Sequence, residues 1–442
     1  MNKATRPIIL LLILLVMFNA RSNAQKIASL EVTLNNEKTG IDVPAHVNLD
    51  GITQLPDSTL NLVEVKGTSR VSVPYQIENK GQRNLYWIVK QTVGQPKKHV
   101  FELITQAPVA VKNHITLVKD RDSGYMTITA NNKNLLRYVY KTVYPPKGID
   151  TAYRRSGFIH PLWSPYGDRL TRIQAPDHYH HFGLWDPWTH TAFDGDTIDF
   201  WNLNSKQGTV KFANFTSVTD GPVYADMQVL QQHIAFLRHG PDKGQQKLAM
   251  NELQSIRIYQ PEAKQDYYIL DITIQLNCAD LPIKLLAYRY AGLGFRGTEK
   301  WNGKNSMMLT SEGKNRDSTD NTSARWLMVQ GQIDNDYAGL VWMSNPTNYS
   351  YPEPMRVWNS KMNGRGDVYA MFAPTKDKDW LLTPGNDYVL KYRFVVYNGK
   401  YDKEKADAAW EYYGHPPVVR VTMANVAAAT TTKKTLSKKT KS

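Results

Sequence analysis

The chain of 442 residues carries 54 Lys and Arg residues against 40 Asp and Glu residues, a formal net charge of +14. Three of the basic residues lie in the first 24 positions and six in the last 26, which leaves 45 basic against 40 acidic residues between them and argues against a nucleic-acid partner. The single cysteine, Cys278, excludes an intramolecular disulfide.

The first residues have the order of a secretory signal. Lys3 and Arg6 precede an apolar run at positions 8–18, and small residues follow as far as Ala24. This order predicts a signal peptide over residues 1–24, cleaved near Ala24, and therefore a periplasmic or secreted protein. The apolar run is about half the length that a bilayer requires, and no later run is long and apolar enough, so we expect no integral membrane association.

Short runs of alternating apolar residues follow the signal. Leu30, Val32 and Leu34 alternate with other residues, and similar runs recur as far as residue 103, with glycine-containing turns between them. Short strands at this spacing are typical of a β-sandwich. We therefore predict an N-terminal Ig-like β-sandwich domain over residues 25–111.

A second series of strand-like runs occupies residues 112–416. Long polar loops separate the runs, and the best candidate for a helix is residues 403–413, with Asp402 as its N-cap. This pattern predicts a large antiparallel β-supersandwich with a site in its loops, and hence an all-β fold for the whole chain. Residues 417–442 have the composition of a basic disordered tail.

Residues 154–202 are the richest segment in functional residue types. Extended geometry would place His178 and His180 on one face and Asp177 and His181 on the other. These groups could bind a transition metal, act as general acids and bases, or form a structural hydrogen-bond network. The histidines, tryptophans and aspartates of the segment are His160, His178, His180, His181, His190, Trp163, Trp185, Trp188, Trp201, Asp177, Asp186, Asp194, Asp196 and Asp199.

The tryptophans of this segment have two interpretations. The face of an indole ring stacks well on a sugar ring, whereas core packing is the commoner position of any single tryptophan. Four tryptophans beside histidines and aspartates favour a binding site as much as a core.

Two further patches could contribute to a site. Residues 288–290, with the sequence Tyr-Arg-Tyr, precede Glu312, which lies in a polar loop and is either a general base or a surface carboxylate. Asn345 begins the other patch, with Arg356 and Trp358 after it, and a plain turn is the alternative there.

Three motifs resemble the signature of a large family of exported bacterial proteins that has no assigned function and is often labelled "methane oxygenase PmoA". They are the runs Arg155–Leu162, Asp177–Trp185 and Asp199–Trp201, although this chain has Phe182 where the family usually has Arg. A membrane subunit of a methane oxygenase needs several spanning helices, which this chain does not offer. The family is also loosely similar to galactose-mutarotase-like enzymes, which implies a large β-sandwich that acts on carbohydrates.

We therefore predict a periplasmic carbohydrate-processing enzyme, a glycoside hydrolase or lyase, that acts on an oligosaccharide or glycoside without a cofactor. The expected catalytic residues are His180 or His181 as the acid and Glu312 or Asp199 as its partner. The expected substrate-binding residues are Arg155, His160, His178, Trp185, Trp201, Tyr288 and Asn345.

Two alternatives to this prediction stay open. One is a non-catalytic glycan-binding or scaffold protein. The other is a metal-dependent enzyme with His178, His180 and His181 as ligands. The oligomeric state does not follow from the sequence.

Overall fold

The computed structural model describes residues 24–34, 41–90, 97–109, 111 and 113–424. The predicted signal peptide, apart from Ala24, and the predicted tail beyond residue 424 lie outside the described residues. The strands of the described chain pair in antiparallel fashion. That part of the chain contains a single α-helix, α1 (Lys403–Gly414), so the all-β prediction is confirmed. None of its helices has the length and apolarity that a membrane span requires.

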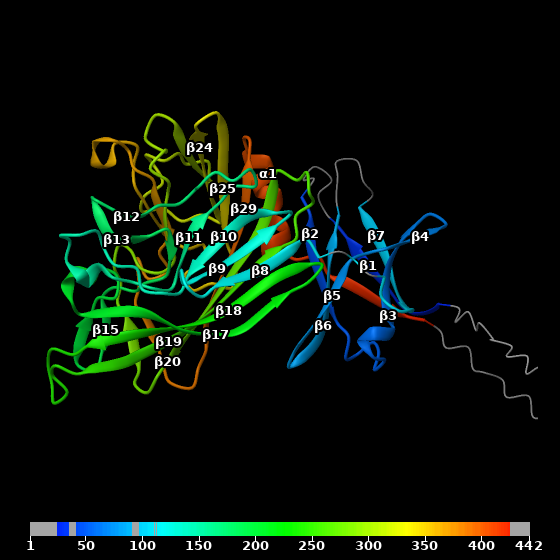
Figure 1. The fold of residues 1–442 in the computed structure, drawn as a ribbon, viewed down its shortest axis with the longest axis horizontal. Helices are drawn as coiled ribbons and strands as arrows, with labels where there is room; N and C mark the ends of the chain where they lie inside the picture. Colours follow the sequence, from blue (N-terminus) through cyan, green and yellow to red (C-terminus); the bar gives the residue numbers. More distant parts are fainter. Residues whose placement is uncertain (1–23, 35–40, 91–96, 110, 112, 425–442) are drawn as a thin grey trace, which may run out of the picture.

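Two sheets form a β-sandwich near the N-terminus, drawn in blue in Figure 1 apart from one red strand that comes from the far end of the chain. Leu30 and Leu103 of the larger sheet are buried with Leu85 and Trp87 of the smaller one, because alternate residues of a strand point to the same face. In spatial order the larger sheet contains β30 (Val419–Met423), β1 (Gln25–Thr33), β7 (Lys98–Thr105), β3 (Leu60–Lys66) and β4 (Ser69–Ser72). The smaller sheet contains β2 (Val43–Asn48), β6 (Gln82–Val89) and β5 (Tyr75–Lys80).

One strand of this sandwich comes from the far end of the chain. The sequence predicts a disordered tail from residue 417, but β30 pairs with β1 over five consecutive residue pairs. The prediction of disorder is wrong for residues 419–423. The edge of β1 offers them backbone hydrogen-bond partners, and the side-chain composition of a short segment does not reveal that such a partner exists. Val421 of β30 is 37% exposed and only Val419 of this strand packs against the core, so backbone pairing is the main contact that holds the strand.

Two eight-stranded sheets form the larger sandwich. Their facing side chains, among them Tyr138, Leu184, Leu270 and Trp342, belong to one hydrophobic cluster, and the predicted large antiparallel sandwich is confirmed. The long-stranded sheet contains β17 (Gly208–Asp220), β18 (Tyr224–Phe236), β19 (Gln246–Tyr259), β20 (Tyr267–Cys278), β29 (Tyr388–Asn398), β25 (Asp336–Ser344), β24 (Trp326–Ile333) and β23 (Ser306–Thr310). The second sheet contains β26 (Met355–Val357), β27 (Tyr369–Phe372), β22 (Gly294–Arg296), β14 (Leu184–Trp185), β11 (Phe158–Leu162), β10 (Lys133–Val139), β9 (Tyr125–Ala130) and β8 (Ile115–Asp120).

Helix α1 and the N-terminal sandwich cover the outer face of the long-stranded sheet. Trp326 of β24 packs in one cluster with Trp410 of α1 and Tyr86 of β6. Asp402 caps α1 as predicted, since its side chain accepts a hydrogen bond from the backbone N–H of Lys405 at 2.8 Å. The outer face of the long-stranded sheet is therefore covered by side chains of α1 and of the N-terminal sandwich.

Short elements fill the connections of the larger sandwich. A hairpin of β12 (Ile173–Ala175) and β13 (His178–Phe182) carries the histidine-rich stretch; it forms a sheet of its own and lies near β11 in Figure 1. A four-stranded sheet contains β16 (Asp196–Ile198), β15 (Thr191–Phe193), β21 (Ile283–Leu285) and β28 (Trp380–Leu382). The 3-10 helices are η1 (Asp57–Thr59), η2 (Thr151–Tyr153), η3 (Leu203–Ser205) and η4 (Met362–Gly364).

Candidate functional site

The hairpin of β12 and β13 brings three histidine rings together. In this hairpin Ile173 pairs with Phe182 and Ala175 pairs with His178. Residues 179–181 of β13 therefore lie opposite one residue of β12, Gln174, and form a β-bulge. A bulge interrupts the alternation of a strand, so the consecutive residues His180 and His181 both join His178. The extended geometry expected from the sequence, with His181 on the opposite face, is therefore wrong.

The three rings form a compact cluster. Ring centroids are 4.7 Å apart for His178 and His181, 4.7 Å for His180 and His181, and 5.3 Å for His178 and His180. One nitrogen of each ring lies within 4.8 Å of the other two. A tetrahedral zinc ion holds its nitrogen ligands about 3.3 Å apart, and small rotations of the half-buried His178 and His180 side chains can close the difference. The three rings can therefore serve as ligands of one metal ion.

Burial keeps two of these rings neutral. It lowers the pKa of His180 to about 3, with smaller contributions from the charges of His178 and Arg296. Burial, together with the neighbouring His180, also holds the pKa of His181 well below its usual value. Nδ1 of His181 is buried and has no hydrogen-bond partner among the described residues. A neutral imidazole with a free lone pair is the form that binds a metal ion, and it lacks the acidic proton that a general acid transfers at neutral pH.

Asp177 orients the third ring. Its carboxylate lies 2.8 Å from His178 Nδ1, and a hydrogen bond there places the ring proton on Nδ1 and leaves Nε2 free to bind a ligand. Burial alone would raise the pKa of Asp177, but the hydrogen bond with His178 and the charge of Arg296 hold it well below its usual range. The carboxylate therefore stays ionised, as the orienting partner of a metal-binding histidine should.

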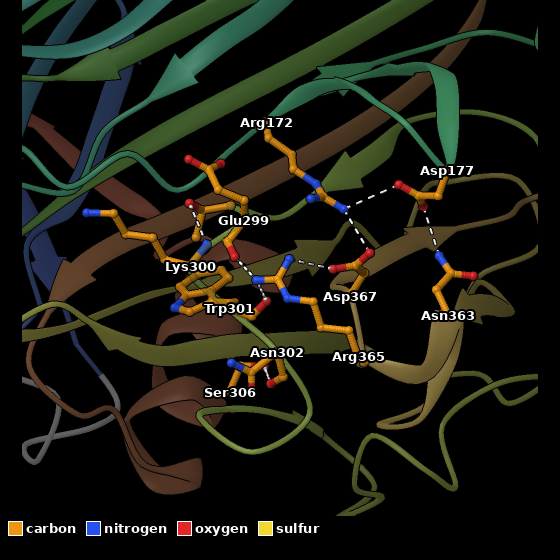
Figure 2. Close-up of polar contacts among 12 residues, drawn as sticks. Arg172, Asp177, Glu299, Lys300, Trp301, Asn302, Ser306, Asn363, Arg365 and Asp367 are labelled. Atoms are coloured by element: carbon orange, nitrogen blue, oxygen red, sulfur yellow. Dashed lines mark hydrogen bonds and ion pairs between the residues drawn. The ribbon is translucent and has the colours of Figure 1, made fainter.

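Two arginines and an asparagine hold Asp177 in turn. Arg296 Nη2 donates to both carboxylate oxygens at 2.9 and 2.7 Å, and Asn363 Nδ2 donates at 2.9 Å. The second arginine, Arg172, bridges Asp177 to another carboxylate, Asp367: it lies 3.5 Å from Asp177 and 2.9 Å from Asp367 (Figure 2). Arg296 and Asn363 follow Asp177 by 119 and 186 residues, so the tertiary fold rather than the local sequence fixes this carboxylate.

A cavity of about 220 Å³ lies against the three histidines. Tyr369 stacks on His181 with centroids 4.9 Å apart and the rings 19° from parallel, and the Trp358 ring lies 4.7 Å from that of His178. None of the ten described residues that line the cavity is acidic, and two are arginines. The lining residues are His178, His180, His181, Trp201, Asn202, Arg289, Tyr290, Arg356, Trp358 and Tyr369. Such a cavity suits a small polar ligand that stacks on aromatic rings.

Trp185 and Trp201 pack against His181 of the histidine cluster. Their ring centroids are 5.1 Å apart, and Trp185 lies 5.0 Å from His181. Their exposed fractions are 1% and 2%, and of the two only Trp201 lines the cavity. Phe182 stands where the motif described above usually has Arg. Its ring is also buried and packs against Phe158, with centroids 4.9 Å apart.

Asp199 and Tyr288 lie beside the cavity without lining it. Asp199 Oδ1 accepts hydrogen bonds from the backbone N–H groups of Trp201 and Asn202 at 2.9 and 2.8 Å, and its Oδ2 accepts one from Asn202 Nδ2 at 2.7 Å. Asn202 also donates to the Tyr290 hydroxyl at 3.0 Å, and the Tyr288 ring lies 4.9 Å from that of Tyr290. The carboxylate of Asp199 therefore shapes the rim of the cavity, and this geometry does not support it as an acid–base partner of the histidines.

Glu312 does not line the cavity. It follows β23 at the edge of the long-stranded sheet, where it accepts a hydrogen bond from Ser311 Oγ at 3.0 Å and lies 3.8 Å from Arg325. Its side chain is 51% exposed, as expected for a surface carboxylate. The structure does not bring it to the histidines as the predicted proton-transfer partner.

Arg155 and His160 also lie away from the cavity. Arg155 is only 2% exposed, and the acids that act on its charge are the buried Glu252 and Asp186. His160 Nδ1 lies 3.0 Å from Thr171 Oγ1, and burial lowers the pKa of this histidine to about 4. Arg155 belongs to the interior of the sandwich, and His160 is partly buried in β11.

The patch that begins at Asn345 is a turn tied to a buried acid. Asn345 Oδ1 accepts a hydrogen bond from the backbone N–H of Thr347 at 3.0 Å, as in an ordinary Asx turn. Asn348 then donates to Glu353 at 2.9 Å, and the Tyr392 hydroxyl donates to the same carboxyl at 2.7 Å. Burial of Glu353 outweighs these hydrogen bonds and raises its pKa to about 7.

Glu353 should make the free energy of unfolding depend on pH. Because its pKa is about 7 in the folded chain against about 4.5 in the unfolded one, the stability that it contributes is full below pH 4.5 and is lost as the pH rises to about 7. The whole change corresponds to about 3 kcal/mol. Denaturant unfolding at pH 5 and pH 8 should show this loss for the wild type relative to Glu353→Gln, with the exposed Glu262→Gln as a matched control. Equal pH dependence of the wild type and Glu353→Gln would contradict the assignment.

Comparison with known proteins finds one family. Its description is "Family of unknown function (DUF6807)", and its sequence model matches residues 125–411. No curated protein matches the chain. The matched range contains the three histidines, Asp177 and the whole lining of the cavity.

Proposed function

The chain belongs to this family of unknown function, DUF6807, and we propose that it is an exported carbohydrate-processing enzyme that uses a metal ion held by His178, His180 and His181. The observation that carries the proposal is the arrangement of three imidazole nitrogens within 4.8 Å of one another at the edge of a cavity. The ionised Asp177 behind His178 supplies the outer hydrogen bond that metal-binding histidines use.

Proton transfer by histidines and carboxylates alone has less support. A glycosidase of the usual kind needs two carboxyl groups that flank the scissile bond, and the described lining of this cavity contains none. With a pKa of about 3, His180 is a neutral imidazole at neutral pH and lacks the acidic proton of a general acid. The same neutral state favours metal ligation.

A site with three histidine ligands leaves a position for water or for a substrate oxygen. An ion held by these histidines would supply Lewis-acid chemistry, either by lowering the pKa of water or by polarising a substrate oxygen. The protein supplies an aromatic wall beside the histidines: Tyr369 stacks on His181 with centroids 4.9 Å apart, and its hydroxyl, whose pKa burial raises well above its usual value, stays protonated and donates to Met371 Sδ at 2.8 Å. A hydrolytic or an eliminative reaction fits this arrangement.

The aromatic lining favours a sugar as the substrate. Trp201, Tyr290, Trp358 and Tyr369 all border the cavity, and aromatic faces stack on the apolar faces of sugar rings. With a volume of about 220 Å³, the cavity is smaller than a site for a drug-sized ligand and suits one sugar unit of a larger chain.

Metal removal and reloading test the proposal. The purified protein is treated with a chelator, dialysed, and titrated with Zn²⁺ by calorimetry and with Co²⁺ by visible absorption. We expect one equivalent of Zn²⁺ to bind with a Kd below about 1 μM, and Co²⁺ to give the intense absorption of a tetrahedral site. Turnover of a panel of glycosides should then disappear with the chelator and return with the metal.

Two results would overturn the proposal. One is the absence of stoichiometric metal binding by the chelated, correctly folded protein. The other is glycoside turnover that is equal in the metal-free and the metal-loaded protein. Metal binding without turnover of any glycan would instead contradict the enzymatic half of the proposal and favour a glycan-binding protein.

A further inference from the structure

We propose that the ligand of this cavity carries an oxyanion, of the kind that a uronate or a sulfated sugar presents, and that Arg289 binds it. The inference rests on the proposed function, because it takes the cavity beside the histidines as the substrate site. It names the substrate class within carbohydrates, namely acidic rather than neutral sugars.

The charges around the cavity are the first argument. Arg289 and Arg356 both line it, and its described lining contains no carboxylate. Arg356 forms an ion pair with Asp320, whose other oxygen accepts a hydrogen bond from the backbone N–H of Val357 at 3.0 Å. Arg356 is thus neutralised within the protein, which leaves Arg289 as the cation that a ligand can meet.

Arg289 has no acidic partner within the part of the chain that the structure describes. The contacts of its guanidinium group are with aromatic rings, at 5.6 Å from the Tyr288 centroid and 5.5 Å from that of Tyr290. Its backbone carbonyl accepts a hydrogen bond from Lys376 Nζ at 3.0 Å, which brings a second cation close to this rim. With Arg356 paired to Asp320, the two cations Arg289 and Lys376 face one rim carboxylate, Asp199, which is held by Asn202, so the rim keeps a surplus of positive charge.

The position of Arg289 is fixed relative to the histidines by a row of rings. Tyr290 accepts a hydrogen bond from Asn202 and packs on Trp201 with centroids 5.1 Å apart. Trp201 in turn lies 6.1 Å from His181. A guanidinium group that rests against two tyrosine rings loses little freedom when it binds a planar anion, and its fork matches the two oxygens of a carboxylate.

Binding of charged and neutral sugars by the metal-loaded protein tests the inference. Calorimetric titrations with D-glucuronate, D-glucose 6-sulfate and D-glucose at low salt compare ligands that differ in the charged group. We expect at least one of the two anions to bind about 10-fold more tightly than glucose, since a charge-assisted hydrogen-bond pair contributes about that much. Preference for glucuronate alone would assign a uronate, and preference for the sulfate would assign a sulfated sugar.

Variants separate Arg289 from general effects of charge. Arg289→Gln should lose the preference for the anion while the Zn²⁺ stoichiometry and the Co²⁺ spectrum stay unchanged. Arg121→Gln, which removes the same charge from the exposed turn between β8 and β9, should keep the preference. Equal affinity for glucose and both anions, the absence of binding by all three, or an undiminished preference in Arg289→Gln would overturn the inference. Failure of the metal to bind would overturn the proposed function instead, and the anion preference can then be measured on the metal-free protein.

Discussion

Replacement of His180 by alanine should lower the affinity for Zn²⁺ by more than about 100-fold and abolish any metal-dependent turnover. The variant removes one of three ligands, whereas the loss of an outer hydrogen-bond partner alone costs 10–100-fold. The fold should tolerate the change, because His180 lies in a short hairpin and is only partly buried. Calorimetric titration of the chelated variant and its denaturant unfolding measure the two effects separately, and we expect the free energy of unfolding without metal to change by about 1 kcal/mol or less.

His239→Ala is the matched control for this variant. His239 is an imidazole paired with Asp196, as His178 is with Asp177, but its side chain is 69% exposed and it does not line the cavity. It should keep the Zn²⁺ stoichiometry and affinity of the wild type. A His180→Ala protein that bound Zn²⁺ as tightly as this control would exclude the histidine cluster as the metal site.

The parts of the fold that the sequence predicts are those in which local pattern decides local structure. The alternation at Leu30, Val32 and Leu34 predicts a strand face, and these residues are fully buried. Asp402 predicts the start of α1 because an N-cap acts within its own turn. β30 could not be predicted in this way, since its stability comes from an edge strand almost four hundred residues earlier in the chain.

The candidate site shows the same division between local and distant information. The density of histidines in residues 154–202 predicts a site there. The geometry of the cluster, however, depends on a bulge that exists only through the pairing of β13 with β12. Tyr369, Arg296 and Asp367 carry no motif, and they reach the site from β27, β22 and the segment before β27. Glu312 and Arg155 are predicted as site residues from their type and segment, yet neither lines the cavity. Residue type alone does not determine where the tertiary fold places a side chain.

Replacement of Arg296 by leucine should lower the free energy of unfolding by about 3 kcal/mol. Arg296 is fully buried, hydrogen-bonds both oxygens of Asp177 and reaches Asp367 at 3.3 Å. Its removal leaves Asp177 and Asp367 to share Arg172, and loss of one partner from a largely buried ion-pair cluster costs more than the pair itself contributes. Denaturant unfolding measures the loss, and the less tightly held Asp177 should also weaken Zn²⁺ binding by about 10-fold.

A matched arginine and a second substitution identify the origin of that loss. Arg365 contacts the same Asp367 at 3.2 Å, but its side chain is 44% exposed, so Arg365→Leu should cost about 1 kcal/mol or less. If uncompensated charge on Asp177 causes the larger loss, then Arg296→Leu combined with Asp177→Asn should recover part of the stability while metal binding stays weak. Equal losses for the two arginine variants would mean that Arg296 acts by packing against Trp358, 4.6 Å away, rather than by holding the carboxylate that orients His178.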